Sequence, residues 1–63
     1  MNLDYWIGRA MMEYGGGFIS ALGKAFLHAD PQNKQIMRNA WPSEFAHYLT
    51  IAQQLKLEDD KLP

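Results

Sequence analysis

The spacing of Glu44 and His47 is the arrangement in this sequence that most suggests metal chemistry. A Glu-x-x-His pair places two ligands on one face of a helix, and di-iron carboxylate proteins use two such pairs with two further glutamates. One chain supplies a single pair, although a homodimer that also contributed Glu13 would complete the set. Phe45 and Tyr48 define the buried face of this segment, and Glu44 and His47 fall beside it. The pattern therefore predicts no bound metal and no cofactor.

Two other features resemble catalytic motifs but lack the residues that would make them work. Ser20 and Ser43 are the only serines, neither lies in a setting that activates a nucleophile, and there is no cysteine. The glycine run at 15–17 precedes a helix, where backbone amides can bind phosphate. A nucleotide-binding loop would continue with Lys and then Ser or Thr, whereas this run continues with Phe18 and Ile19. The sequence predicts a protein that is not an enzyme.

The segment 31–40 carries side chains of the kinds that recognise DNA. Gln35, Arg38 and Asn39 can make paired hydrogen bonds to base edges in the major groove. Lys34 and Arg38, four residues apart, could contact phosphates from one helical face. The chain has six basic and seven acidic residues, however, whereas DNA-binding domains are usually basic. A helix-turn-helix-like DNA-binding protein using helix 31–40 is therefore the alternative function, with nucleic acid the less expected partner.

A surface for a protein partner is the leading hypothesis. Eight aromatic residues and four methionines exceed what the core of a 63-residue chain can hide, and both residue types are enriched at interfaces. Tyr5, Trp6 and Met12 lie off the main apolar stripe of the first helix. If the partner binds nucleic acid, acidic side chains could compete for its basic groove. The candidates are Asp30, Glu44, Glu58, Asp59 and Asp60.

Helix-start and helix-stop residues divide the chain into the elements that would position these side chains. The helical segments cover about residues 3–14, 18–28, 31–40 and 42–57. Glycines 15–17 would each cost on the order of 1 kcal/mol inside a helix, so a turn is predicted there, with one glycine in the left-handed conformation. Asn2 and Asp30 are suitable N-caps, and Pro31 and Pro42 suit first turns. The mostly charged residues 58–63 are expected to form a frayed acidic tail.

Apolar residues recur at three- and four-residue spacing in the predicted helices. Those expected to face the core are Leu3, Ile7, Ala10, Met11, Tyr14, Phe18, Leu22, Ala25, Phe26, Ala29, Ile36, Met37, Ala40, Trp41, Phe45, Tyr48, Leu49, Ala52 and Leu55. The small residues Ala21 and Gly23 would allow a neighbouring helix to approach closely. No stretch alternates cleanly between polar and apolar residues. The sequence thus predicts an all-α fold, a compact bundle of three to four short helices forming one domain over 1–57.

Composition also bears on the compartment and on self-association. The absence of cysteine excludes disulfides and thiolate metal sites. No apolar stretch approaches the roughly 20 residues that cross a bilayer, and residues 1–4 do not look like a secretory signal. We therefore expect a cytoplasmic protein without membrane contact. Because apolar burial in so short a chain only just offsets the entropy of ordering, a homo-oligomer or a bound partner is also expected.

One longer pattern covers about half of the chain. It consists of Tyr14-Gly15-Gly16-Gly17-Phe18, Ala21-Leu22, Ala25, Ala29-Asp30, Asn33, Ala40-Trp41-Pro42, Phe45 and Tyr48. This pattern resembles a group of small proteins common in tailed bacteriophages and prophages. The resemblance implies a phage or prophage origin, a bacterial host cytoplasm and no enzymatic role. Small phage proteins of this kind often block a host or defence protein, as anti-CRISPR inhibitors do, so an inhibitor or modulator of such a protein is the expected function.

Overall fold

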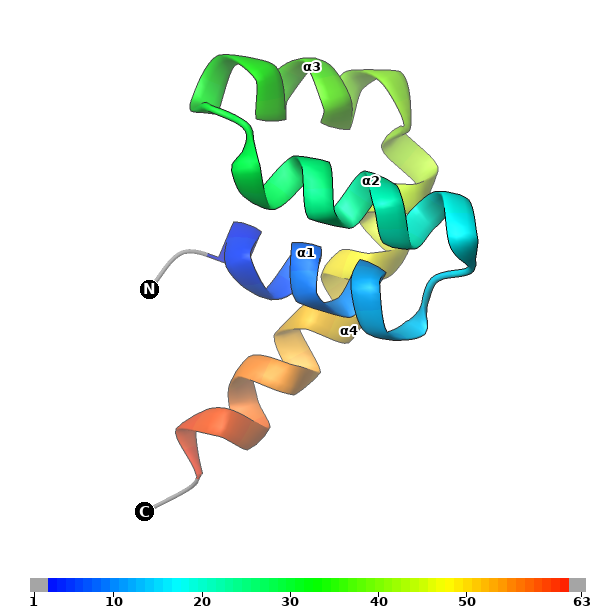
Figure 1. The fold of residues 1–63 in the computed structure, drawn as a ribbon. Coiled ribbons are helices and arrows are strands. Elements are labelled where there is room, and N and C mark those ends of the chain that lie inside the picture. Colours follow the sequence, from blue (N-terminus) through cyan, green and yellow to red (C-terminus); the bar gives the residue numbers. More distant parts are fainter. Residues whose placement is uncertain (1–2, 62–63) are drawn as a thin grey trace.

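The computed structural model describes residues 3–61 as four α-helices joined by short turns (Figure 1). The helices are α1 (Leu3–Tyr14), α2 (Gly17–His28), α3 (Pro31–Ala40) and α4 (Pro42–Asp60). No strand occurs among these residues, which confirms the prediction of an all-α bundle of short helices. The predicted cap Asn2 lies outside the described residues.

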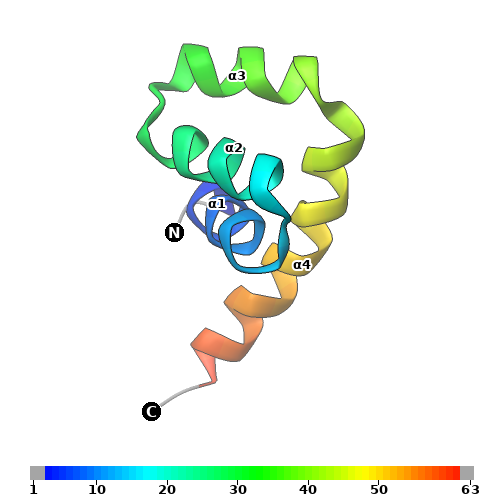
Figure 2. The same ribbon diagram turned by 45° about the vertical axis from the view of Figure 1, so that its right-hand side comes forward.

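The end of α4 differs from the prediction. Residues 58–60 were expected to be frayed, but the helix continues through Asp60. Lys56 Nζ lies 2.9 Å from Asp60 Oδ2, and an ion pair between residues four apart stabilises a helix by a few tenths of a kcal/mol. Figures 1 and 2 both show this part of α4 extending past the other three helices.

Glycines allow α1 and α2 to pack closely. A Cβ atom built on Gly23 would lie 2.6 Å from Met11 Cβ and 2.9 Å from the carbonyl oxygen of Gly8. A Cβ on Gly8 would collide with the side chain of Leu27. The predicted close approach at Gly23 is thus confirmed, whereas the predicted role of Ala21 is wrong because its side chain is exposed.

The turn between α1 and α2 uses its glycines differently from the prediction. No residue among 3–61 has a positive φ, so the expected left-handed glycine is wrong. The Gly15 N–H donates to the Met11 carbonyl at 3.0 Å, and Gly16 has extended backbone angles before α2 begins. A Cβ on Gly15 would collide with Ile19 and with the Met11 carbonyl oxygen. Gly15 is therefore required by a close contact and not by its backbone angles.

The core lies where α1, α2 and α4 meet. The rings of Phe26 and Phe45 have centroids 4.8 Å apart and are both buried. The buried apolar residues are Ile7, Ala10, Met11, Leu22, Phe26, Phe45 and Ala52, all of which were predicted to face inward. Five predicted core residues are exposed instead: Tyr14, Phe18, Ala25, Ile36 and Ala40. Tyr14 and Phe18 lie at the turn end of the α1–α2 hairpin.

Helix α3 is the least buried of the four. It runs back along α2 in the opposite direction, and none of its residues is buried (Figures 1 and 2). Met37 and Trp41 pack against the core as predicted, whereas Ile36 lies on the outer face. The Asn33 N–H donates to Asp30 Oδ1 at 2.7 Å, which confirms Asp30 as the N-cap.

Candidate functional site

A groove lies between the start of α2 and the start of α4. It is shallow, with a volume of about 500 Å³, and is more open to solvent than enclosed. The residues that line it are Phe18, Ile19, Ser43, Glu44, His47 and Tyr48. Pockets that bind small molecules usually have volumes of about 300–1,000 Å³.

Aromatic rings form much of the groove wall. Phe18 is 60% exposed, and its ring meets that of Trp41 edge-on at a centroid distance of 5.9 Å. The rings of His47 and Tyr48 are nearly perpendicular, with centroids 4.9 Å apart. Trp41 and Tyr48 also pack against the core, so the exposed rings rest on a fixed support.

The connection between α3 and α4 places the α4 side of the groove. Trp41 is at once the C-cap of α3 and the N-cap of α4: its N–H donates to the Met37 carbonyl, and its carbonyl accepts from the Phe45 N–H. A one-residue connection leaves little freedom in where α4 begins. His47 and Tyr48 follow Glu44 by three and four residues, so all three side chains lie on the same face of α4.

Glu44 gives the groove its charge. It is the only Asp, Glu, Lys or Arg among the six lining residues, and its side chain is half-buried. Within residues 3–61, no hydrogen bond or ion pair holds its carboxylate. Its position in the first turn of α4 sets the negative charge at the positive end of the helix dipole. The groove is therefore apolar and aromatic with one carboxylate at its edge.

The Glu44–His47 pair is not joined by further metal ligands. In the part of the chain that the structure describes, no group of three or more His, Cys, Asp or Glu side chains is arranged to hold a metal ion. Glu13, the additional ligand considered from sequence, does not line the groove. The pair instead contributes a carboxylate and an imidazole to the wall of the groove.

The predicted partner residues of α1 have different surroundings from one another. Tyr5 and Met12 are exposed, and the Tyr5 hydroxyl accepts a hydrogen bond from Arg9 Nη1 at 2.7 Å. Trp6 packs against the core, and its Nε1 is buried without a hydrogen-bond partner in the structure. Trp6 is therefore largely a packing residue and not the exposed anchor that its position in the helical pattern predicted.

The predicted acidic residues do not gather in one place. Asp30 caps α3, and Asp60 pairs with Lys56 near the end of α4, where Glu58 and Asp59 are also exposed. Of the eight residues predicted to bind a partner, the groove contains Glu44 alone.

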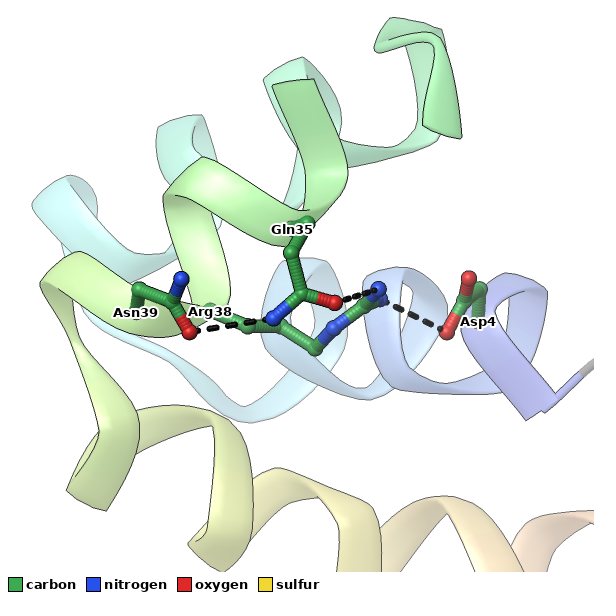
Figure 3. A network of polar contacts seen from close by, with 4 residues as sticks. All are labelled: Asp4, Gln35, Arg38 and Asn39. Carbon is green, nitrogen blue, oxygen red and sulfur yellow. Dashed lines mark hydrogen bonds and ion pairs between the residues drawn. The ribbon is translucent and has the colours of Figure 1, made fainter. Parts of the chain in front are cut away.

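The residues assigned to DNA recognition are joined to one another and to α1 (Figure 3). Arg38 Nη1 donates to Asp4 Oδ1 and Arg38 Nη2 donates to Gln35 Oε1, both at 3.2 Å. Gln35 Nε2 donates in turn to Asn39 Oδ1 at 3.0 Å. The network connects α3 to the start of α1, so these groups already have partners within the molecule.

Two of the same residues cover the aromatic core. Lys34 Nζ lies 5.5 Å and Arg38 Cζ 5.7 Å from the centroid of the Phe26 ring. Both side chains are half-buried, and their aliphatic parts cover apolar surface that α3 would otherwise leave open. A helix-turn-helix sets its two helices at about 90–120°, whereas α3 runs back along α2.

Sequence reasoning missed the groove because Phe18 falls on the same helical stripe as Leu22 and Phe26 and was assigned to the core. The available signal was the glycine run at 15–17, which places Phe18 at the very start of a helix. Among residues 3–61, no helix combines the length and the apolar character that crossing a membrane requires. No family model matches the chain, and neither does a curated protein or a solved structure.

Proposed function

We propose that this protein is a small phage-type protein–protein interaction module. It would inhibit or modulate a bacterial host or defence protein in the host cytoplasm, without enzymatic activity of its own. The observation that carries the proposal is the groove, where the exposed Phe18 ring stands beside Tyr48, His47 and Glu44. The phage origin comes from the sequence resemblance and stays a prediction.

Physical chemistry favours a docking role for such a groove. Large aromatic side chains at the centre of an interface contribute most of the binding free energy. The Phe18 ring rests on Trp41, which packs on the core, so little side-chain entropy is lost when a partner covers it. A monomer that exposes an aromatic ring in a groove therefore has a surface suited to a partner side chain.

The DNA-binding alternative is less well supported. To read bases, Gln35, Arg38 and Asn39 would have to leave the network that connects α3 to Asp4. The net charge of −1 also provides no general attraction to phosphate. We therefore assign α3 a structural role.

The test is affinity capture of the tagged protein from bacterial lysate, with and without nuclease, followed by mass spectrometry. The wild type is compared with Phe18→Asp and with the control Leu57→Asp, since these positions are 60% and 55% exposed. We expect one stoichiometric bacterial protein that survives nuclease, is lost with Phe18→Asp and is retained with Leu57→Asp. Circular dichroism checks that both variants remain helical.

Two results would contradict the proposal. Capture that disappears with nuclease and with Arg38→Ala would favour DNA binding through α3. Equal capture by Phe18→Asp and the wild type would place the docking surface elsewhere. Trp6→Asp does not serve this purpose, because it would introduce a charge against the core and disturb folding.

A further inference from the structure

We infer that the groove recognises a positively charged side chain of the partner, an arginine by preference, that projects from an apolar segment. This inference rests on the proposed function and specifies the chemistry of the partner at the same site. Three features of the groove support it: its charge, its aromatic rings and its size.

No basic side chain of residues 3–61 is paired with the charge of the groove. Glu44 contributes a half-buried carboxylate, and no cationic side chain of residues 3–61 pairs with it. The other five lining residues include no Lys or Arg. A carboxylate that a partner removes from water needs an opposite charge or hydrogen-bond donors to replace its hydration. A partner that covers the groove with a cation meets this requirement, whereas a purely apolar partner does not.

The aromatic rings suit a cation as well. A guanidinium or ammonium group is attracted to the face of an aromatic ring within about 6 Å of its centroid. The protein already uses this contact elsewhere, with Arg9 over Tyr5 at 5.7 Å. The Tyr48 ring stands on the same helical face as Glu44. An arginine can stack on a ring and donate two hydrogen bonds to a carboxylate, which lysine cannot do with the same geometry.

The size of the groove is compatible with such a segment. Its volume of about 500 Å³, largely open to solvent, leaves room for one long side chain and an apolar neighbour. Phe18 and Ile19 offer apolar contacts on the α2 side, opposite the carboxylate on α4. We therefore expect the partner segment to place a basic side chain against Glu44 and an apolar side chain against Phe18.

The experiment uses the ¹⁵N-labelled protein and two probes of nearly the same shape. N-acetyl-arginine methylamide carries the charge, and N-acetyl-citrulline methylamide is its neutral analogue. We expect the arginine probe to shift the amide resonances of residues 17–19 and 43–48 with millimolar affinity, at least about threefold more tightly than the citrulline probe. Glu44→Gln should remove this difference. The control Glu13→Gln, an exposed carboxylate of α1 outside the groove, should keep it.

Every other outcome contradicts the inference, and each one shows which part of it is wrong. Equal affinity of both probes for the groove would contradict cation recognition and leave the docking role intact. Shifts outside the groove, no shifts at all, or an equal effect of Glu13→Gln and Glu44→Gln would contradict Glu44 as the determinant. If the groove resonances shifted with protein concentration alone, without a probe, the occupant of the groove would be a second copy of this chain. The docking role is tested separately. It would be contradicted if Phe18→Asp captured as much of the bacterial protein as the wild type does.

Discussion

Gly17 and Gly23 lie on the same helix but differ in the space available for a side chain. Space beside Gly17 is empty, since a Cβ atom there would meet nothing within 4 Å, whereas a Cβ on Gly23 would approach Met11 and the Gly8 carbonyl. We expect Gly23→Ala to destabilise the protein by about 1–3 kcal/mol, because α1 and α2 must separate. Urea denaturation followed by circular dichroism measures this change.

Gly17→Ala is the matched control for that prediction. It adds the same methyl group to α2 at a position with negative φ and open surroundings, so it should stabilise the helix by about 0.4–1 kcal/mol. If both substitutions changed stability in the same direction and by the same amount, close packing at Gly23 would not be the reason for the glycine.

The exposure of Phe18 and Tyr14 could not be predicted from the apolar pattern of the sequence. Periodicity identifies the face of a helix that turns inward, and it correctly predicted Leu22 and Phe26. It does not indicate how far along the axis the neighbouring helix extends. Phe18 shares the stripe but lies in the first turn of α2, so it is exposed and lines the groove.

Helix starts were the most predictable elements, because capping depends on residues close in sequence. Asp30 accepts from the Asn33 N–H as expected from the Asp-Pro signal. We expect Asp30→Ala to cost about 1 kcal/mol of stability, while Asp30→Asn, which keeps an acceptor oxygen, should cost far less. Thermal unfolding of the two variants compares them directly, and equal losses would contradict the capping role.

The attachment of α3 was not predictable, because it depends on contacts distant in sequence. Arg38 and Asp4 are 34 residues apart, and their side chains are 32% and 22% exposed. For a partly exposed pair we expect a coupling free energy of about 0.5–1 kcal/mol in a double-mutant cycle of Asp4→Asn and Arg38→Gln. A coupling free energy near zero would mean that Lys34, Met37 and Trp41 hold α3 without the ion pair.

Local stability should differ between the helices. Because α3 has no buried residue, its backbone amides should exchange with deuterium faster than those of α1 and α2. Hydrogen-exchange NMR measures this order, with the Arg38→Gln variant expected to increase exchange in α3 selectively. Uniform exchange across all four helices would contradict it.

At the scale of the whole molecule, the solvent-accessible surface area shows that the chain is compact. Its accessible surface is 4234 Å², and a compact monomer of this mass of 7.2 kDa exposes about 4,100 Å². The area of one chain does not decide its oligomeric state, and composition favours a homo-oligomer because apolar burial in so short a chain only just offsets the entropy of ordering. Sedimentation equilibrium at micromolar concentration tests this: a dimer mass would support it, and the mass of a single chain would contradict it.

The bundle class followed from the sequence, whereas the groove depends on how the helices are placed. Its two sides come from residues 18–19 and 43–48, which approach only because α4 begins directly after Trp41 and then passes behind α1 in the view of Figure 1. No local pattern carries that information.

Site-specific photo-crosslinking in living bacteria tests most directly whether the protein docks on a partner through the groove. A photoreactive phenylalanine analogue replaces Phe18 in the groove, Ile36 on the outer face of α3, or Leu57 near the end of α4, three exposed apolar positions. Docking through the groove predicts a crosslink to one bacterial protein from position 18 and none from positions 36 and 57. A crosslink from position 36 or 57 in the absence of one from position 18 would contradict docking through the groove.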